Sequence, residues 1–231
     1  MNKLVNCGLE NRFGTNCLKW DGLKSRFGNE NLIAMWVADM DFKAPQPVID
    51  ALKERVNHGI FGYNIIPDSY YEAFINWEKE KHGYNVKKEW IRFSPGVVPA
   101  LFWFINILTN PGDSCIVMGP VYYPFHDAIK ENERKLIFNN LKNDNGIYTI
   151  DFEKFEEDII ENQVKLFILS SPHNPIGRVW TKEELKRVLD ICKANDVFVL
   201  ADEIHQDIII GDKKQIPAAT IGNYDDILVT L

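Results

Sequence analysis

The chain has 231 residues, a length that allows one large domain or one domain with part of a second. Its 45% hydrophobic and 26% charged residues are usual for a soluble globular protein that can bury a full core. The formal net charge of −7, without any run rich in Lys or Arg, argues against a nucleic-acid partner.

The lack of targeting signals, together with the cysteine usage, predicts a cytoplasmic protein without membrane contact. No apolar run reaches the roughly 18 residues of a membrane span, and the amino terminus has no signal-peptide profile. The four cysteines form no CxxC pair and have no His at metal-ligand spacing. We therefore expect free thiols in a reducing compartment and no metal site.

The N-terminal part of the chain is predicted to be an irregular arm followed by helices. Residues 1–30 are polar and rich in Gly and Asn, and the apolar stretch MWVADMDF follows at residues 35–42. An apolar stripe at helical spacing then predicts a helix between Pro47 and Gly59. The Gly-rich loop HGIFGYN, residues 58–64, comes next.

Capping signals predict the starts of three further helices. Ser69 with Glu72 and Thr181 with Glu184 have the spacing of a capping box. Asp151 is expected to cap an acidic helix that extends to about residue 162.

From Ser94 onward the chain alternates between predicted strands and helices. Short apolar runs without alternation are typical of strands buried on both faces. They cover residues 114–119, 135–141, 166–171, 197–201 and 227–231. Pro99 suits the first position of a helix that extends to Leu108, and residues 126–134 have helical character. The alternation predicts an α/β fold with a doubly wound, mainly parallel sheet.

The segment from Lys165 to Gln206 is predicted to be a βαβ unit. A helix joins its two strands, so the strands are expected to be parallel. The polar clusters Ser171–Gly177 and Asp202–His205 then emerge at the carboxyl edge of one sheet, where open α/β sheets bind ligands.

Four loop tips carry candidate site residues, and each allows a structural and a functional interpretation. The amides of Gly96, Val97 and Val98 before a helix could hold a phosphate or form an ordinary turn. Tyr122 could stack on a flat ring or pack in the core. Asn174 could be a turn residue.

Asp202, at a strand end, could cap a loop or act in a site. Together the four tips suit a phosphorylated aromatic heterocycle. A carboxylate that faces a ring nitrogen keeps the nitrogen protonated, and a protonated pyridine withdraws electrons from carbanions, which is the chemistry of pyridoxal phosphate.

Several motifs resemble a known enzyme family. SSPHNPIGRVW, ADEIH, SPGVVPAL, PVYYPF, MWVADMDF and HGIFGY are similar to segments of the fold-type I pyridoxal-phosphate enzymes of the aminotransferase class I/II superfamily. Within it they resemble the cystathionine (cysteine-S-conjugate) β-lyase group of MalY, PatB and cystalysin. The resemblance covers nearly the whole chain, in the family's order.

The resemblance implies a cofactor role for seven residues. Asp202 would pair with the pyridine nitrogen, Asn174 and His205 would lie near the phenolic oxygen, and Tyr122 would stack on the ring. The backbone amides of Val97 and Val98 would bind the phosphate. Tyr63 would reach the phosphate of the neighbouring subunit's cofactor, which implies a homodimer. A histidine at position 205, where general aminotransferases have tyrosine, is typical of the lyase group.

The resemblance also implies a substrate rim and a domain division. Trp36 and Ala38 would border a small sulfur-containing amino acid, and Tyr123 would help to bind substrate or cofactor. Residues 1–46 would form an arm that contributes to a small domain and to this rim. Residues 47–231 would form a partial cofactor-binding large domain.

One departure from the family concerns catalysis. The family's Schiff-base lysine lies in a motif shortly after the strand that here reads ILVTL, and the chain ends at Leu231. Lys213 and Lys214 lie in a GDKKQ turn that is expected to be solvated, so no catalytic residue is assigned. The chain is expected to be the first three-fifths of such an enzyme and to show no β-lyase turnover alone.

Three functions remain open at this point. The first is a C–S β-lyase that releases pyruvate, ammonia and a thiol from cystathionine or a related conjugate. The second is an aminotransferase, although MWVADMDF and DEIH favour the lyase. The third is a non-catalytic fragment, or a regulatory or binding protein that keeps the fold.

Overall fold

The computed structural model describes residues 8–231 in two compact units. The N-terminal unit ends at Ile65, and the C-terminal unit comprises Ile66–Leu231. No helix within residues 8–231 has the length and apolar character needed to cross a membrane. The predicted division at residue 46 stays a prediction.

The N-terminal unit contains one long helix and two short ones. Helix α3 (Gln46–His58) is followed by Gly59, whose φ of 72° ends the helix as predicted. Helices α1 (Leu18–Asp21) and α2 (Leu23–Phe27) lie in the arm that the sequence predicted to be irregular. They are shorter than two turns, too short for an apolar period to reveal them.

Asp41 is the centre of a polar network in the N-terminal unit. Its carboxylate accepts a hydrogen bond from Trp20 Nε1 at 2.9 Å and pairs with Lys19 at 2.8 Å and Arg12 at 3.3 Å. Arg12 also pairs with Asp39 at 2.8 Å. The hydrogen bond from Lys19 is the main reason that the pKa of Asp41 lies below its usual value. The network ties the end of the MWVADMDF segment to the arm.

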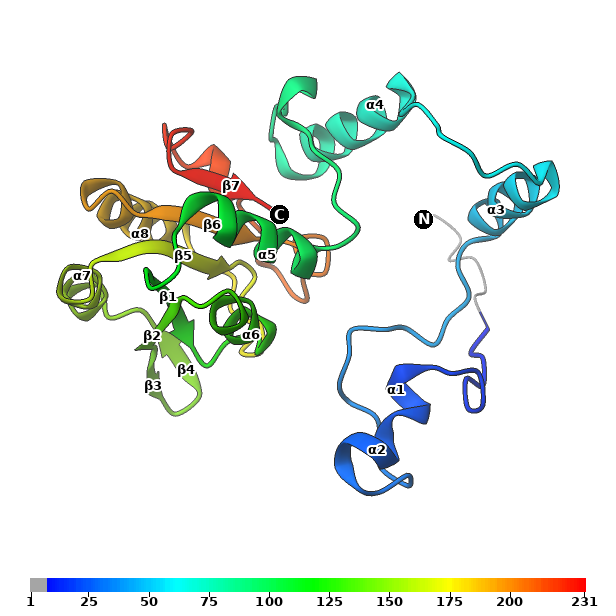
Figure 1. The fold of residues 1–231 in the computed structure, drawn as a ribbon, viewed down its shortest axis with the longest axis horizontal. Coiled ribbons are helices and arrows are strands. Elements are labelled where there is room, and N and C mark those ends of the chain that lie inside the picture. Colours follow the sequence, from blue (N-terminus) through cyan, green and yellow to red (C-terminus); the bar gives the residue numbers. More distant parts are fainter. Residues whose placement is uncertain (1–7) are drawn as a thin grey trace. The chain divides into compact units, whose positions relative to one another are not determined.

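The C-terminal unit is built on a five-stranded parallel sheet in the order β2-β1-β5-β6-β7 (Figure 1). The strands are β1 (Ser114–Gly119), β2 (Lys135–Asn140), β5 (Val164–Ser170), β6 (Phe198–Asp202) and β7 (Leu228–Thr230). The predicted doubly wound parallel sheet is therefore confirmed. Ser114 to Gly119 are buried throughout, as expected for a strand covered on both faces.

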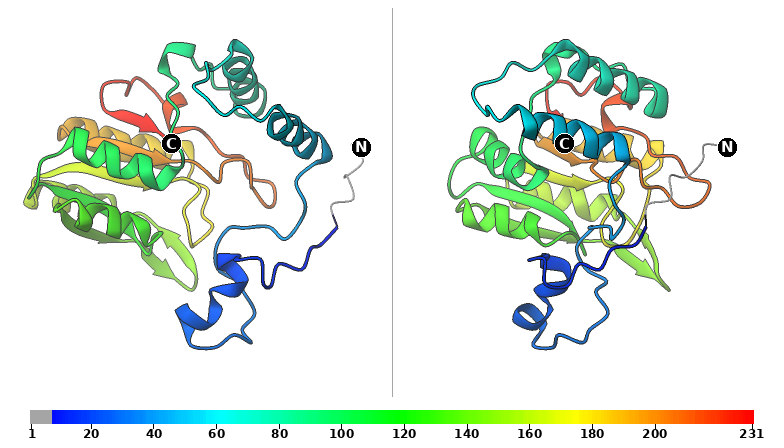
Figure 2. Two further views of the ribbon diagram at one scale, coloured as in Figure 1. Left: turned by 45° about the vertical axis from the view of Figure 1, so that its right-hand side comes forward. Right: turned by 90° about the vertical axis from the view of Figure 1, so that its right-hand side faces the viewer.

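Helices cover both faces of this sheet, as the turned views in Figure 2 show. Helices α5 (Val97–Leu108) and α6 (Pro124–Glu131) pack on one face, against Cys115 and Val117. Helices α7 (Phe152–Glu161) and α8 (Lys182–Ala194) pack on the other, against Ile116 and Met118. Successive residues of β1 thus enter opposite cores, as the two-residue period of a strand requires.

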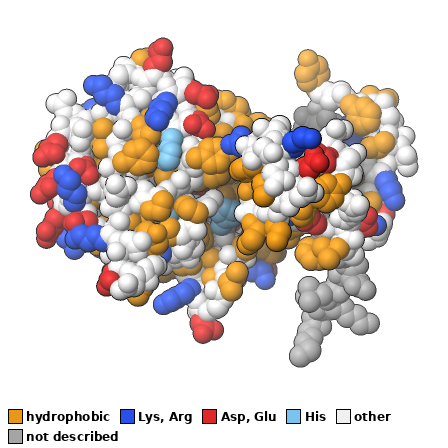
Figure 3. Space-filling model, turned by 90° about the horizontal axis from the view of Figure 1, so that it is seen from below, with side chains coloured by type: hydrophobic (Ala, Val, Ile, Leu, Met, Phe, Trp, Pro, Cys, Tyr) orange, Lys and Arg blue, Asp and Glu red, His pale blue; other side chains and the backbone are white. Residues whose placement is uncertain are grey.

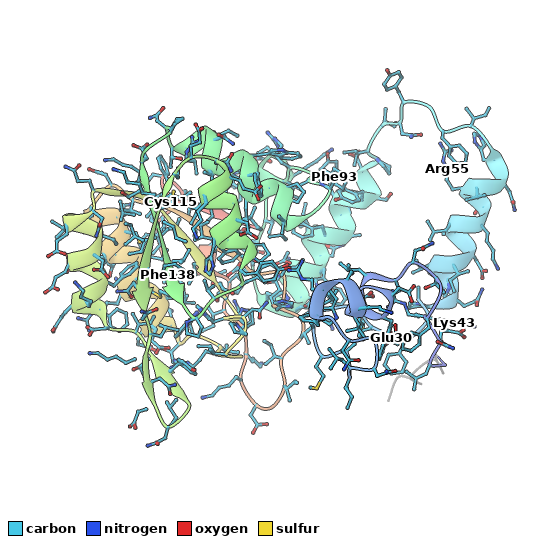
Figure 4. The ribbon with its side chains drawn as sticks, turned by 60° about the horizontal axis from the view of Figure 1, so that its bottom comes forward. Glu30, Lys43, Arg55, Phe93, Cys115 and Phe138 are labelled. Carbon is cyan, nitrogen blue, oxygen red and sulfur yellow. The ribbon has the colours of Figure 1, made fainter. Side chains whose placement is uncertain are left out.

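The sheet has an edge at β2, where side chains reach the solvent. Phe138 of β2 is 46% exposed, whereas Cys115 of the neighbouring strand β1 is fully buried (Figure 4). Hydrophobic side chains also reach the surface on α5, where Trp103 and Ile107 are 49% and 72% exposed. Figure 3 shows hydrophobic patches among charged side chains on one face.

The remaining elements of the C-terminal unit are short or precede the sheet. They are α4 (Asp68–Trp77), the π-helical turn η1 (Glu78–His82), the 3-10 turns η2 (Lys88–Trp90) and η3 (Ala218–Thr220), and the hairpin β3 (Lys142–Asp144) and β4 (Ile147–Thr149). Residues 145 and 146 form the turn of this hairpin.

Two of the three predicted helix caps are confirmed. Thr181 and Glu184 form a reciprocal capping box, and Asp151 accepts a hydrogen bond from Lys154 N. The capping box at Ser69 is wrong, because α4 already begins at Asp68. The first helical position predicted for Pro99 is also wrong, because α5 begins two residues earlier at Val97. Pro99 is still within the first turn, where its missing N–H is not needed.

Candidate cofactor site

The site lies where the strand order of the sheet reverses. From β1 the chain first adds β2 on one side and later adds β5 on the other. The loops after β1 and β5 therefore leave the sheet in opposite directions, and open α/β sheets bind ligands at the carboxyl edge beside such a reversal. Tyr122 follows β1, Asn174 follows β5 and Asp202 ends β6.

Asp202 is a buried carboxylate at this edge. It pairs with Ser170 in the β5–β6 register, and its backbone oxygen accepts a hydrogen bond from Ser171 N at 2.9 Å. The residue is only 6% exposed, and its Oδ1 accepts a hydrogen bond from Ile204 N at 3.1 Å. Burial raises the pKa of the Asp202 carboxyl, against the opposing effects of the Ile204 amide and the charge of His205.

No ion pair within residues 8–231 includes Asp202. A buried carboxylate without a cation carries an unrecovered desolvation cost, so this edge of the sheet suits a ligand that brings a positive charge or an N–H donor.

Tyr122 lies close to Asp202. Burial is the main cause that raises the pKa of the Tyr122 hydroxyl, and the charges of Tyr123 and Asp202 add to it. The Tyr122 ring is partly buried against the core beneath α5 and α6 and meets Phe125 edge-on at 5.9 Å. Tyr123 is 52% exposed, with its ring 5.6 Å from that of Tyr122. Tyr122 thus has the packing contact that the sequence left open, and its stacking on a cofactor ring stays a prediction.

The loop that carries Asn174 is fixed by hydrogen bonds from neighbouring residues. The backbone N–H of Asn174 donates to Ser170 Oγ at 3.0 Å, and His173 Nε2 bonds to Pro120 O at 2.9 Å. Because a carbonyl oxygen only accepts, Nε2 carries the proton. His173 is 1% exposed and burial lowers its pKa, so a neutral ring links the loops after β5 and β1.

Helix α5 presents its N-terminus at the same edge. A short turn joins Leu108 to the beginning of β1, so the other end of the helix lies where the strands end. Gly96 is the N-cap and makes no side-chain capping bond, so the amides of Val97 and Val98 have no intrahelical partner. Such amides, with the positive end of the helix dipole, favour an anion.

His205 lies in the turn that follows β6. It is partly buried, and its charge acts on the Asp202 carboxyl. Its backbone oxygen accepts a hydrogen bond from Ile208 N at 2.9 Å. His205 and Tyr122 thus both interact electrostatically with the same buried carboxylate.

Three predicted site residues belong to the N-terminal unit. Trp36 donates its indole N–H to Lys19 O at 3.0 Å, and Ala38 is exposed. Between them Val37 has a φ of 57°, which is rare for a β-branched residue and strains the backbone. Tyr63 is fully exposed. Their roles at the site stay predictions.

The sequence reasoning missed a polar layer next to the site. Glu203 is 4% exposed, and its Oε1 accepts hydrogen bonds from Ala218 N at 2.8 Å and Gln215 Nε2 at 3.5 Å. Gln215 Nε2 also bonds to Ser171 O and Oγ at 2.9 Å. Charged and amide residues inside a turn sequence give no local signal of burial, because these partners come from distant parts of the chain.

Comparisons with known proteins agree with this geometry. Residues 30–231 match the family model of aminotransferase class I and II. Cystathionine beta-lyase PatB of Bacillus subtilis (strain 168) is 43% identical over 222 residues, which are 96% of this chain and 57% of that protein. The chain therefore spans little more than half the length of this relative.

Two solved structures are similar in fold and sequence. A PLP-bound putative aminotransferase from Clostridium difficile 630 has a TM-score of 0.91 and 44% identity, over 96% of this chain and 58% of that chain. The PLP-bound C-S lyase from Staphylococcus hominis has a TM-score of 0.90 and 37% identity, over 96% of this chain and 57% of that chain. The chain belongs to the aminotransferase class I and II family.

Proposed function

We propose that the protein carrying this chain is a pyridoxal-phosphate-dependent C–S β-lyase, and that this chain forms the cradle of the cofactor. The reaction breaks the Cβ–S bond of cystathionine or a related cysteine conjugate and, with one water, yields a thiol, pyruvate and ammonia. The names of PatB and of the S. hominis lyase support the reaction type. The observation that carries the cofactor assignment is the buried Asp202, which has no ion pair among the described residues and lies at the end of β6, the strand next to β5 at the switch point.

The chemistry of Asp202 fits a pyridine ring. An ionised carboxylate accepts a hydrogen bond from a protonated ring nitrogen and gains the charge partner that it lacks among residues 8–231. When bound, pyridoxal phosphate supplies a protonated pyridine that withdraws electrons from the substrate's Cα. Asp202 would keep the proton on the ring nitrogen, and each pKa unit gained by that nitrogen corresponds to about 1.4 kcal/mol.

The neighbouring residues would orient the same ligand. Tyr122 would stack on one face of the ring and exclude water from it. The Val97 and Val98 amides would bind the phosphate, with the helix dipole adding about 0.3–1 kcal/mol. Asn174 and His205 would donate hydrogen bonds to the phenolic oxygen. The exposed Lys213 and Lys214 are not assigned the role of the Schiff-base lysine.

The substrate rim and the second subunit are part of the same proposal. Trp36 and Ala38 would border the sulfur-containing amino acid, with Tyr123 near it. Tyr63, which is fully exposed, would contact the cofactor phosphate of a partner subunit in a homodimer. Acidic net charge and the absence of a Lys/Arg-rich run favour a small-molecule substrate over nucleic acid.

Binding of pyridoxamine 5′-phosphate to this chain tests the cradle. The compound has the ring nitrogen and the phosphate but no aldehyde, so its binding needs no lysine. We expect Asp202→Asn to weaken binding at least tenfold by titration calorimetry, a loss of about 1.4 kcal/mol, because an amide cannot balance the ring charge.

Asp196→Asn is the matched control, because exposed Asp196 lies before β6, at the opposite edge of the sheet. The control should bind like the wild-type chain. Equal affinities of the wild-type chain and Asp202→Asn would contradict the assignment of Asp202.

The reaction type has its own test in the natural protein that carries this sequence. A lyase releases pyruvate from cystathionine without a keto-acid acceptor, whereas an aminotransferase, the function named for the C. difficile structure, needs the acceptor. Release that depends on the acceptor would favour the aminotransferase. Ligand binding without either activity would favour a non-catalytic or regulatory protein.

A further inference from the structure

The turn that carries His205 is held by hydrogen bonds to side chains from a distant part of the chain. Trp77, at the end of α4, donates its indole N–H to both oxygens of Asp207, at 3.2 and 3.0 Å. His82 Nε2 lies 2.8 Å from Asp207 Oδ1. The Asp207 carboxylate thus forms hydrogen bonds with two aromatic side chains, both of which lie more than a hundred residues earlier in the chain.

A second contact holds the residue between His205 and Asp207. Gln206 Nε2 donates to Glu78 Oε1 at 2.9 Å, and Glu78 is only 3% exposed. Burial raises the pKa of Glu78, with His82 and the Gln206 bond acting against the shift. Two consecutive residues after His205 are therefore fixed by Trp77, Glu78 and His82, which we call the clasp.

The clasp depends on the π-helical turn η1. In an α-helix each residue turns the chain by about 100°, so positions five apart point about 140° away from each other. Trp77 and His82 are five apart and nevertheless reach the same carboxylate. The wider π turn, closed by i→i+5 bonds, brings such positions to one face, and turns of this kind are frequent at functional sites.

The clasp has a counterpart on the other side of His205. Glu203 is anchored to Ala218 N at 2.8 Å, and Gln206 N donates to Glu203 O at 2.8 Å. His205 thus lies between an anchored residue that precedes it and two clasped residues that follow it. The backbone on both sides of His205 is therefore held by side chains that are not candidate cofactor ligands.

We propose that Trp77, Glu78 and His82 are positioning residues, which hold His205 beside Asp202 by binding Gln206 and Asp207. The proposal rests on the proposed function, because His205 matters there as a donor to the cofactor's phenolic oxygen. The clasp residues act through His205 and do not contact the cofactor.

Asp207→Asn tests the clasp in the whole chain. The asparagine side chain has one acceptor oxygen where aspartate has two. Its NH2 group cannot accept the hydrogen bonds that Trp77 and His82 donate to Asp207. We expect amide hydrogen exchange of residues 204–208 to become at least about tenfold faster, since the clasp closes that turn. We also expect the ¹⁵N chemical shifts of the His205 imidazole to change at fixed pH, and pyridoxamine 5′-phosphate to bind about three- to tenfold more weakly.

Asp212→Asn is the matched control, because Asp212 is an exposed acid a few residues later in the same connection. It should leave all three readouts unchanged. His82→Leu should reproduce the effects of Asp207→Asn. His82→Gln should show smaller effects than His82→Leu, because the glutamine amide still donates to Asp207. Should Asp207→Asn fail to fold, the His82 pair decides the proposal.

The outcomes separate this proposal from the proposed function. Faster exchange with unchanged His205 shifts would make the clasp merely structural and overturn the positioning role, as would a His82→Gln variant no better than His82→Leu. Failure of the wild-type chain to bind pyridoxamine 5′-phosphate would overturn the cofactor assignment instead. The His205 shifts would then still decide whether the clasp positions His205.

Discussion

Asp202 and Glu203 are consecutive acids with separate surroundings. Side chains at consecutive positions of an extended chain point to opposite faces. Asp202 lies near Tyr122 and His205, whereas Glu203 contacts Gln215 and the amide of Ala218. One strand end therefore supplies both the candidate ligand of the cofactor and an anchor of the turn behind it.

Glu203 should make the stability of the chain depend on pH. Burial raises the pKa of Glu203 to about 8, with the charges of Glu78 and Asp202 adding to the shift. Between the unfolded pKa of about 4.3 and this value, the folded state keeps a proton that the unfolded state has lost. The free energy of unfolding therefore decreases as pH rises through this window, by on the order of 1 kcal/mol per pH unit.

Glu203→Gln should remove this contribution, because the amide has the same shape and keeps an oxygen for the Ala218 amide. Urea unfolding at pH 5, 6, 7 and 8 should give a flatter stability profile for the variant than for the wild-type chain. Glu156→Gln, an exposed position on α7, should keep the wild-type slope. A wild-type slope in Glu203→Gln would contradict the prediction.

At the scale of elements, the sequence predicted the strands and helices whose formation depends on neighbouring residues in the chain. The strands were predictable because buried parallel strands are continuous apolar runs, as in β1 and β5. The positions of Tyr122, Asn174 and Asp202 at or after the ends of strands followed from the shared carboxyl edge of parallel strands. The thirteen residues of α8 follow a cap and a stripe, both visible in the sequence.

The elements that the sequence did not reveal depend on distant partners. The π turn η1 places Trp77 and His82 on Asp207, which lies 130 and 125 positions away, so no nearby residue signals it. Helix α4 begins at Asp68, whose carboxylate pairs with Lys88, rather than at the capping box expected at Ser69. Tertiary contacts here override a local preference.

The capping box of α8 should contribute measurably to stability. Glu184 N donates to Thr181 Oγ1 at 3.1 Å, and Thr181 N donates to Glu184 Oε2 at 2.9 Å. Thr181→Ala leaves the Glu184 amide without this acceptor and should lower the free energy of unfolding by about 1 kcal/mol. Urea denaturation measures the change. Thr149→Ala, at an exposed hairpin position, should change stability by less than about 0.5 kcal/mol, and an equal effect of both variants would argue against the cap.

At the scale of the whole molecule, two thiols report on the integrity of the C-terminal unit. Cys115 and Cys192 are fully buried in the cores on opposite faces of the sheet. Burial raises the pKa of Cys115 to about 12 and that of Cys192 further above its usual value. A thiol that is neither exposed nor ionised reacts slowly with an alkylating reagent.

We therefore expect the peptides that contain Cys115 and Cys192 to stay unmodified by iodoacetamide under native conditions, and to react together as denaturant unfolds the unit. Mass spectrometry of the digested chain measures both. The fully unfolded chain provides the reference rate. Modification of either cysteine in native buffer at the reference rate would show that its core opens without global unfolding.

The strand order also constrains how the chain folds during synthesis. Strand β1 pairs early with β2, but its other edge waits for β5, as in the pairing of Val117 with Ile168. At about 5–20 residues per second, a ribosome takes several seconds to make the intervening chain. During that interval the inner edge of β1 exposes unpaired backbone groups and the residues that later form both cores. The reversal of strand order at β1 thus leaves one edge of this strand unpaired until β5 has been synthesised.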